Sequence, residues 1–347
     1  MSEQTRTYTV VSIPGDGIGP EVSNAVRRVL RAARAPIEFV EHHAGEAALA
    51  HGHQDLLPEA TLEAIREHRV ALKGPCTTPI GRGFRSVNVA LRQKLSLFAA
   101  VRPVRTMPGV PTRFDAIDLV IVRENTEGLY SGVENVITDD VVVSMKVATR
   151  VACHRIALWA FRYATHRGRR KVSVFHKANI MKLTDGMFLE ESRKVHTDDF
   201  PNIEYNEHII DAALMRLVHD PGQFDILLCE TLYGDLVSDL CAGLVGGLGV
   251  APGANIGNQQ AIFEAVHGSA PTIAGKGVAN PLALLMSATM MLNHLAVQHD
   301  DGDCRDVATR IRQAYDSALR DEQRTRDLGG ELGTEAFTQA VIERLPG

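Results

Sequence analysis

The sequence lacks several patterns that would place it in a specialised class of protein. Its five cysteines are odd in number and scattered, and they form no C-x-x-C pair, so neither a disulfide framework nor a zinc site is indicated. The formal net charge of −5 gives no electrostatic footprint for nucleic acid. We therefore expect no nucleic-acid partner, and the free cysteines favour a reducing compartment, which we take to be the cytoplasm.

Long apolar runs are also missing. The most apolar segment, residues 281–297, contains Ser, Thr, Asn and His and is short for a membrane span, which favours a buried helix and no membrane partner. The first fifteen residues lack the charged-then-apolar pattern of a secretory signal, so secretion is not expected. No internal repeat, low-complexity segment or Ser/Gly linker divides the 347 residues. If there are two domains, the chain should cross between them more than once.

What the sequence does have is a regular alternation of two patterns. Short β-branched runs, typical of strands, alternate with segments whose apolar residues recur at helical spacing. The predicted strands are 8–13, 68–73, 117–124, 171–175 and 224–230, and the predicted helices are 21–34, 58–68, 153–166 and 185–196. With 45% hydrophobic and 23% charged residues, this alternation predicts an α/β fold with a parallel or mixed sheet covered by helices.

A glycine cluster, "GDGIGPEV" (15–22), lies between the first predicted strand and helix. That position invites a dinucleotide-binding interpretation, but Pro20 stands where G-x-G-x-x-G requires its last glycine. Proline is well suited to the first turn of a helix. A tight strand-to-helix turn and direct cofactor contact both remain open.

Four arginines fall among small and apolar neighbours: Arg85, Arg92, Arg102 and Arg123. One such arginine could form a surface ion pair, whereas several that converge would bind the carboxylates of a polyanionic small molecule. Lys177 follows a predicted strand directly. It is either an exposed strand-end lysine or, beside other cations or desolvated, a base.

The segment "LYGDLVSDL" (232–240) places Asp235 and Asp239 four residues apart in an apolar run. On a helix the two carboxylates share one face and repel each other unless a cation lies beside them. Carboxylate oxygens suit Mg²⁺ or Mn²⁺. Asp235 could instead cap the helix N-terminus, although capping would not explain Asp239.

Nine segments taken together indicate a family. In chain order they are "GDGIGPEV", "KGPCTTP", "RSVNVALR", "VRP", "RENTEGLYSG", "HKANIMK", "LYGDLVSDL", "GGLG" and "HGSAPTIAGKGVANP". Across nearly the whole chain they resemble the isocitrate/isopropylmalate dehydrogenase family, which decarboxylates 3-carboxy-2-hydroxy acids oxidatively with a metal ion and NAD or NADP. The resemblance implies two α/β domains with a large mixed sheet, not a Rossmann fold. Residues 1–97 and 250–347 would form a large cofactor-binding domain, and 98–249 a small domain with the dimer interface and a β-rich arm at about 131–149.

The resemblance also implies a role for individual residues. Lys177 would remove the substrate hydroxyl proton through a network with Asp211, and Tyr130 would protonate the enol carbon. Asp211, supplied by the neighbouring protomer, would join Asp235 and Asp239 as metal ligands. The implied substrate-binding residues are Ser86, Asn88, Arg92, Arg102 and Arg123. The implied cofactor-binding residues are Thr78, His267, Gly268, Ser269, Ala270, Thr272, Ile273 and Asn280.

Residues that differ between members of the family predict the preferred substrate and cofactor. Ser86 and Asn88 offer hydrogen bonds to a third carboxylate, which favours isocitrate, and so a place in the tricarboxylic acid cycle, over isopropylmalate and homoisocitrate. Thr272 and Ile273 replace the Lys-Tyr pair of relatives that use NADP, so NAD is favoured over NADP, with Arg326 as one remaining contact for a phosphate. We expect a homodimer or a higher homo-oligomer.

Alternatives remain because Thr231 stands where the family commonly has Asn. The substrate could be an isocitrate analogue, either homoisocitrate, isopropylmalate or a phosphonate. The chain could also be a non-catalytic regulatory subunit of a hetero-oligomeric isocitrate dehydrogenase. Retention of the acid, base and metal-binding residues favours catalysis.

Overall fold

The computed structural model of the chain describes residues 6–78 and 86–346. Its residues group into two compact units, each of which is discontinuous in sequence. Unit 1 comprises Met1–Leu95, Thr106–Arg113 and Val245–Gly347, and unit 2 comprises Ser96–Arg105 and Phe114–Leu244. The segment Thr106–Arg113, which the sequence analysis placed in the middle domain, groups with the two ends of the chain. The cofactor-binding and dimer-contact roles of the two domains stay predictions.

Unit 1 has five strands in the order β2-β1-β3-β12-β11. Their bounds are β1 Tyr8–Ile13, β2 Ile37–Glu41, β3 Val70–Lys73, β11 Pro252–Ile256 and β12 Ala261–Ala265. Neighbouring strands are parallel except for β11 and β12, which are antiparallel. The carboxyl ends of β1, β3 and β12 therefore lie at one edge, where α/β proteins commonly bind ligands.

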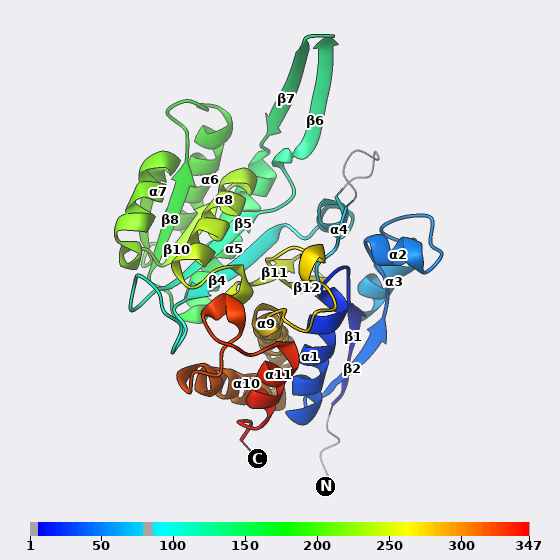
Figure 1. Cartoon of the computed structure of the whole chain (residues 1–347). Coiled ribbons are helices and arrows are strands. Elements are labelled where there is room, and N and C mark those ends of the chain that lie inside the picture. The colour runs from blue at the N-terminus through cyan, green and yellow to red at the C-terminus, as the bar shows by residue number, and fades with distance from the viewer. Residues whose placement is uncertain (1–5, 79–85, 347) are drawn as a thin grey trace. The chain divides into compact units, whose positions relative to one another are not determined.

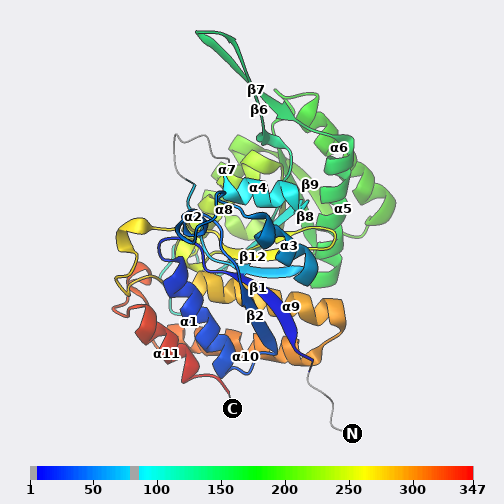
Figure 2. The ribbon, with the colours of Figure 1, turned by 90° about the vertical axis from the view of Figure 1, so that its right-hand side faces the viewer.

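The helices of unit 1 come from both ends of the chain. They are α1 Gly19–Ala32, α2 Glu46–Ala50, α3 Glu59–His68, α4 Val87–Lys94, α9 Leu282–His299, α10 Gly302–Arg320 and α11 Thr334–Ile342, with short 3₁₀ turns η2 Leu248–Val250, η3 Pro271–Ile273 and η4 Arg326–Leu328. Helix α9 packs on β11 and β12 and also contacts α1 and α10, and α11 packs on α1 and α10. Figure 2 shows these four helices grouped together. Most of α9 is buried. In the described part of the chain, no helix has both the length and the apolarity needed to cross a bilayer.

Five strands of unit 2 belong to the large sheet, in the order β4-β5-β10-β8-β9. Their bounds are β4 Ala99–Arg105, β5 Asp118–Glu124, β8 Lys171–His176, β9 Glu204–Ile209 and β10 Ile226–Cys229. Among these five described strands, β4 and β5 pair antiparallel and the other neighbours are parallel. The helices of unit 2 are α5 Arg150–Arg167, α6 Thr184–Asp199, α7 Ile210–His219 and α8 Thr231–Leu244, with the 3₁₀ turn η1 Pro221–Gln223. The predicted α/β class with a large mixed sheet is confirmed.

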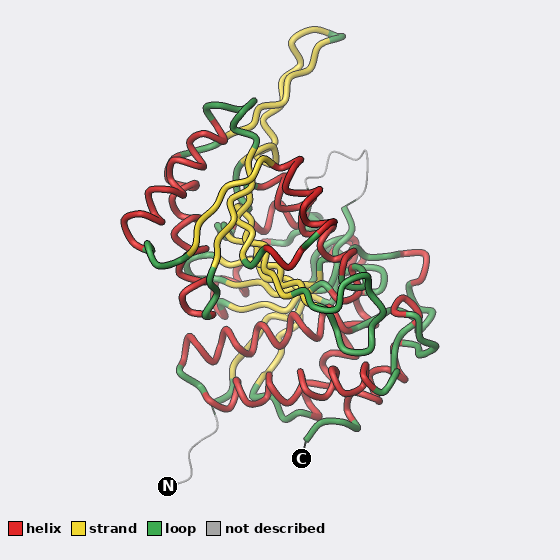
Figure 3. The backbone as a smooth tube through the Cα atoms, turned by 90° about the vertical axis from the view of Figure 1, so that its left-hand side faces the viewer, coloured by secondary structure: helices red, strands yellow, loops and turns green. Residues whose placement is uncertain are grey.

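A long hairpin extends from unit 2. Strands β6 Gly128–Thr138 and β7 Val141–Val147 pair antiparallel as a separate two-stranded sheet, and their tips project beyond the other elements of the unit (Figures 1 and 3). Val136 is 71% exposed and Val142 63% exposed. Apolar side chains so exposed on a hairpin are typical of a surface that binds another protein.

The aromatic core of unit 2 generates a stability prediction. Phe161 on α5 is fully buried and stacks on Phe200 with ring centroids 5.6 Å apart. We expect Phe161→Ala to lower the free energy of unfolding by about 3–5 kcal/mol, because a buried ring is replaced by a cavity. Urea unfolding followed by circular dichroism measures the change. Val151→Ala, on the exposed side of the same helix, is the matched control and should stay within about 0.5 kcal/mol of wild type; equal losses in the two variants would contradict this account of the core.

Candidate active site

The two aspartates of "LYGDLVSDL" lie on α8, which begins at Thr231. Asp235 is therefore in the second turn and does not cap the helix. Glu230 takes that role, because its Oε1 accepts a hydrogen bond from the Tyr233 N–H at 3.0 Å. Of the two roles left open for Asp235, capping is excluded, and its charge needs another explanation.

Asp235 is the centre of a charged cluster within unit 2. Its Oδ1 accepts hydrogen bonds from Arg123 at 2.5 Å and from Arg102 at 3.2 Å. Its Oδ2 accepts a hydrogen bond from the Tyr130 hydroxyl at 2.6 Å. The strands β4, β5 and β6 thus each contribute one donor to a single carboxylate on α8. Arg102 also lies 3.8 Å from Asp239, so two carboxylates balance the two guanidinium groups. Each guanidinium presents a fork of N–H donors, the geometry that binds carboxylates.

Close packing holds this cluster in place. The Arg123 side chain is fully buried, and a Cβ on Gly234 would lie 2.5 Å from Arg123 Cγ. Only glycine at that position lets α8 approach β5 closely enough for Asp235 to reach the guanidinium. The Tyr130 ring lies 5.0 Å from the Arg123 guanidinium carbon, a cation–π distance.

The cluster shifts the protonation of two of its members. Burial, followed by the hydrogen bond to Asp235, raises the pKa of Tyr130, so its hydroxyl remains protonated at neutral pH and can donate. Burial also raises the pKa of Asp239; Arg102 acts to lower it and the like charge of Asp235 to raise it. The two carboxylates repel each other, as their spacing on the helix predicts.

Lys177 and Asp211 form a second group of unit 2, apart from this cluster in the hydrogen-bond network. Lys177 directly follows β8, and its Nζ lies 2.5 Å from Asp211 Oδ1 in the first turn of α7. The hydrogen bond from Lys177 is the main cause that lowers the pKa of Asp211. The pair is accessible: the side chains are 26% and 68% exposed.

One chain does not complete the predicted metal site. Asp235 and Asp239 share one face of α8, but Asp211 belongs to the other group, and no three His, Cys, Asp or Glu residues within 6–78 and 86–346 are placed to hold a metal ion. The donors nevertheless fit Mg²⁺ or Mn²⁺ chemically, because all are carboxylates and Asp239 keeps a 59% exposed side chain.

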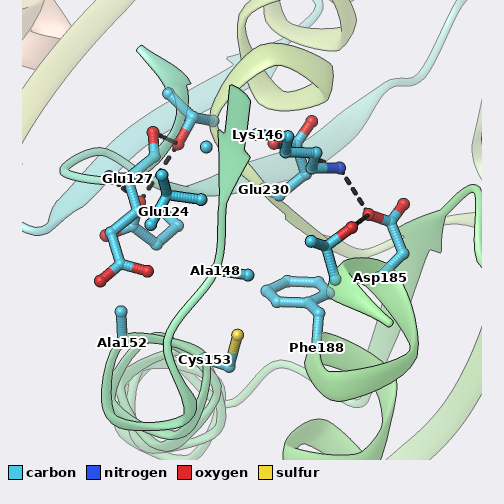
Figure 4. Close-up of a pocket in the computed structure, with 13 residues that line it drawn as sticks. Glu124, Glu127, Lys146, Ala148, Ala152, Cys153, Asp185, Phe188 and Glu230 are labelled. Carbon is cyan, nitrogen blue, oxygen red and sulfur yellow. Dashed lines mark hydrogen bonds and ion pairs between the residues drawn. The ribbon is translucent and has the colours of Figure 1, made fainter. Parts of the chain in front are cut away.

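A small cavity of about 30 Å³ lies behind the Tyr130 strand in unit 2, large enough for a single water. Figure 4 shows Lys146 of β7 beside Asp185 and Glu230 on its wall. Lys146 Nζ lies 2.5 Å from Asp185 and 3.7 Å from Glu230. Asp185 also accepts the backbone N–H of Lys177 at 2.7 Å. Sequence reasoning missed the Lys146–Asp185 pair that supports Lys177. Lys146 and Asp185 are 39 residues apart, so they give no local signal in the sequence.

Thr231, the departure from the family pattern, lines the same cavity. Its side chain is buried, and its hydroxyl hydrogen-bonds to the Glu127 carbonyl at 2.8 Å and lies 3.1 Å from Glu124 Oε2. Thr231 therefore contacts the segment that leads into β6. Its shorter side chain is accommodated inside unit 2.

The predicted substrate residues of unit 1 lie on α4 and at its N-cap. Ser86 is the N-cap residue and accepts the Val89 N–H. Asn88 Oδ1 is buried and has no hydrogen-bond partner among the described residues, so it is available to a ligand. Arg92 is nearly buried and lies 3.7 Å from Glu264. Arg85 lies outside the described residues.

Glu264 on β12 supports Arg92 and was not predicted. Burial acts to raise its pKa, but Lys73 and Arg92 outweigh burial and lower the pKa to about 2. The buried Lys73 lies 2.5 Å from Glu264. Both members of this ion pair are buried, and the pair holds Arg92 beside the carboxyl ends of β3 and β12.

The predicted cofactor residues of unit 1 follow β12 in a loop. His267 places Nδ1 3.0 Å from the Gly268 carbonyl, whereas its Nε2 is buried and without a partner in the described residues. Burial is the main cause that lowers the pKa of His267, so the ring is neutral at neutral pH. With the proton on Nδ1, Nε2 presents a lone pair to a donor such as an adenine amino group or a ribose hydroxyl.

The remaining cofactor residues continue this loop. Asn280 Nδ2 donates to Asp327 Oδ2 at 3.0 Å, and Thr272 is exposed in η3. Thr78 Oγ1 accepts the Val87 N–H at 3.2 Å. Asp327 was missed in the sequence. The orphaned His267 nitrogen and the polar Asn280–Asp327 pair fit the adenosine portion of a nicotinamide dinucleotide.

The fold and the cluster define a class: a two-unit α/β protein with a mixed sheet, a hairpin and an arginine–carboxylate site. The model of one family, Isocitrate/isopropylmalate dehydrogenase, matches residues 9–345. The chain therefore belongs to the isocitrate/isopropylmalate dehydrogenase family.

Individual relatives agree with this assignment. The chain is 48% identical to "Isocitrate dehydrogenase [NAD] catalytic subunit 5, mitochondrial" of Arabidopsis thaliana, over 98% of this chain and 89% of that protein. It is 51% identical to "3-isopropylmalate dehydrogenase, chloroplastic" of Solanum tuberosum, over 84% and 81%, and 45% identical to a mitochondrial regulatory subunit of the NAD isocitrate dehydrogenase of Dictyostelium discoideum, over 99% and 94%. The crystal structure of isocitrate dehydrogenase from Methylococcus capsulatus matches with a TM-score of 0.92 at 45% identity, over 98% and 99%.

These names contradict the expected cytoplasmic location. Relatives from Arabidopsis thaliana, Schizosaccharomyces pombe and Drosophila melanogaster are all named mitochondrial, which points to a mitochondrial rather than a cytoplasmic location. The prediction was wrong because free cysteines separate reducing from oxidising compartments, but do not separate one reducing compartment from another.

The exposed carboxylate of the cluster generates a prediction about metal binding. We expect Asp239→Asn to weaken Mn²⁺ binding at least about 10-fold, because the substitution keeps the size of the side chain and removes a charged oxygen ligand. Calorimetric titration with Mn²⁺ measures the affinity, and activity should recover in part as Mn²⁺ is raised. Asp118→Asn, an exposed carboxylate of the same unit paired with Arg169, is the control; unchanged Mn²⁺ affinity in Asp239→Asn would exclude Asp239 as a ligand.

Proposed function

We propose that the chain catalyses the oxidative decarboxylation of isocitrate to 2-oxoglutarate and CO₂, with NAD as the oxidant and Mg²⁺ or Mn²⁺ as the metal. The observation that carries this proposal is the cluster of Arg102, Arg123 and Tyr130 on Asp235. It combines two carboxylate-binding groups, a protonated acid and a metal-binding oxygen donor within one unit. The relatives named NAD isocitrate dehydrogenases support the same reaction.

The choice of isocitrate rests on polar groups at α4. Overall identity does not decide it, because the potato isopropylmalate dehydrogenase is as similar as the isocitrate dehydrogenase subunits. Asn88 leaves a buried oxygen without a partner among the described residues, and Ser86 is exposed beside it. An apolar substituent at this place would leave polar groups unpaired, which disfavours isopropylmalate strongly.

The chain's residues supply binding, orientation and proton transfer. Arg92, Arg102 and Arg123 would hold the substrate carboxylates fixed, which lowers the entropic part of the barrier. Lys177, hydrogen-bonded to Asp211, would take the proton of the C2 hydroxyl as hydride leaves C2. Tyr130 would return one proton to C3 after CO₂ departs, so the proton taken and the proton given balance.

A bound dinucleotide and a metal ion would supply the remaining chemistry. Bound NAD would accept the hydride, and a divalent ion held by Asp235, Asp239 and a third carboxylate would stabilise negative charge on the C2 oxygen. Thr272 lacks both the cation that would bind a 2′-phosphate and the carboxylate that would repel it. We therefore propose that NAD is preferred over NADP by a modest margin. The exposed Arg326 would reduce this preference, because it could contact the 2′-phosphate of NADP.

We further propose that a complete site draws on two chains. Asp211 is predicted to act in the neighbouring protomer's site. Lys177 lies 2.5 Å from Asp211, so the same chain would supply both residues to that site. Tyr130, Asp235 and Asp239 would come from the other chain. Exposed apolar residues support such an association: Met215 on α7 is 59% exposed and Leu236 on α8 is 55% exposed, and these two helices pack together.

A second candidate is a regulatory subunit of a hetero-oligomer, because one relative at 45% identity carries the word regulatory in its name. The two functions differ in a simple experiment. A purified single chain that turns over isocitrate is catalytic, whereas a regulatory subunit would show turnover only with a second, different chain.

We expect the purified chain, with Mn²⁺, to reduce NAD with isocitrate and to show a kcat/KM for isopropylmalate lower by about 10⁴-fold. We expect NAD to be preferred over NADP, and Thr272→Asp to sharpen that preference by at least about 10-fold, because a carboxylate would repel the 2′-phosphate. Absorbance of the reduced nicotinamide measures each of these rates. Thr309→Asp, on an exposed helix of the same unit, is the control for added charge; comparable kcat/KM for isopropylmalate would refute the substrate assignment.

Mixing two inactive variants tests the shared site. Tyr130→Phe and Lys177→Met should each lose activity by about 10²-fold or more, because each lacks one proton-transfer group. Co-refolding the two variants should restore about a quarter of wild-type activity, since half of the dimers are mixed and each mixed dimer has one intact site. Co-refolding either variant with itself is the control. No recovery in the mixture would show that Tyr130 and Lys177 act within one chain.

A further inference from the structure

The glycine turn "GDGIG" packs against protein rather than leaving room for a ligand. Cβ atoms on Gly15, Gly17 and Gly19 would collide with the carbonyl oxygens of Pro75, Ser269 and Pro14. Gly15 and Gly17 also have positive φ values, +77° and +58°, which only glycine adopts freely. The space that a phosphate cradle would need beside these residues holds backbone from two other segments of unit 1.

Asp16, between the first two glycines, is nearly buried, at 7% exposure. Its carboxylate accepts three backbone hydrogen bonds, from Glu46 at 3.0 Å, Ala47 at 2.7 Å and Thr77 at 2.5 Å. Hydrogen bonds from backbone N–H groups to an ionised carboxylate are about twice as strong as neutral ones. One side chain thus fixes the start of α2 and the segment that follows β3.

The same turn contacts both segments predicted to bind the cofactor. The Ile18 N–H donates to the Ser269 carbonyl at 2.9 Å, and the hydroxyls of Thr77 and Ser269 are hydrogen-bonded at 2.7 Å. Thr77 precedes Thr78 in the chain, and Ser269 lies in the loop that begins at His267. The turn therefore joins the segment at Thr77 to the loop at Ser269 on their buried side.

We propose that Asp16 is a positioning residue for the dinucleotide: it fixes Thr77, and through the Thr77–Ser269 contact it fixes the loop that follows His267. This inference rests on the proposed function, because it assumes that the loop binds NAD. Asp16 need not touch the cofactor. Its substitution acts by letting the two segments move apart, which raises the energetic cost of forming the site when NAD binds.

Asp16→Asn tests the proposal while keeping the size of the side chain. The amide has one accepting oxygen in place of two, so at least one of the three backbone N–H groups loses its partner. We expect the Kd for NADH, measured by fluorescence titration without substrate, and the KM for NAD to rise at least about 10-fold, the ratio that the loss of one charge-assisted hydrogen bond gives. The kcat at saturating NAD and the KM for isocitrate should stay within about 2-fold of wild type.

Thr77→Val and Thr77→Ser give a second test if Asp16→Asn folds poorly. Valine removes the hydroxyl that contacts Ser269 and should weaken NADH binding, whereas serine keeps the hydroxyl and should restore it. Thr338→Val is the matched control, because Thr338 is a buried threonine of the same unit whose hydroxyl bonds to the Thr334 carbonyl in α11. It should lower the thermal midpoint with no change in the Kd for NADH.

The outcomes separate the inference from the proposed function. Folded Asp16→Asn and Thr77→Val proteins that bind NADH as tightly as wild type would overturn the positioning role and leave NAD as the cofactor. A wild-type chain that binds no NADH would overturn the proposed cofactor and this inference with it. A rise in Kd for both variants, reversed in Thr77→Ser and absent in Thr338→Val, would support it.

Discussion

The ion pair between Arg123 and Asp235 is the interaction on which the candidate active site depends. Two carboxylates on one face of α8 would repel each other and destabilise the helix if nothing compensated their charge. Arg123 is fully buried, and burial of an unpaired guanidinium costs several kcal/mol. Each side of the pair therefore requires the other, and α8 must approach β5 for the two to meet.

The need for this ion pair also constrains the residues around it. Gly234 has to be glycine because the Arg123 side chain occupies the place of its Cβ. Tyr130 is oriented by its hydrogen bond to the same carboxylate, and burial together with that bond raises its pKa, so the hydroxyl stays protonated. Arg102 joins the same carboxylate from the antiparallel strand β4. One carboxylate thus orients an acid and two anion-binding groups.

Much of the fold could be predicted because it depends on local patterns. The predicted strands 8–13, 117–124 and 171–175 correspond closely to β1, β5 and β8, since their apolar runs are buried and bounded by polar turns. Strand β9, "EYNEHI", was missed because it is polar and never fully buried. The segment of β11, which contains Pro and Gly, was missed because tertiary pairing with β12 overrides its weak propensity.

The site could be predicted only where one segment carries the chemistry. Asp235 and Asp239 stand out because two charges interrupt an apolar run. The partners that hold the predicted residues, Lys146 with Asp185 and Lys73 with Glu264, are far apart in sequence, and each of them alone looks like an ordinary charged residue. Burial turns them into ion pairs, and burial is a property of the folded chain.

The cofactor loop has two faces with different freedom to change. Its inner face, at Ser269, is held by Ile18 and Thr77, and the glycines beneath it admit no side chain. On the outer face of the loop Thr272 is exposed, and Arg326 is exposed in the separate turn η4. Under the proposed function, substitutions that alter cofactor preference can therefore accumulate on the outer face at little cost to folding. The inner face would stay constant while selection, natural or in the laboratory, changes which dinucleotide the loop accepts.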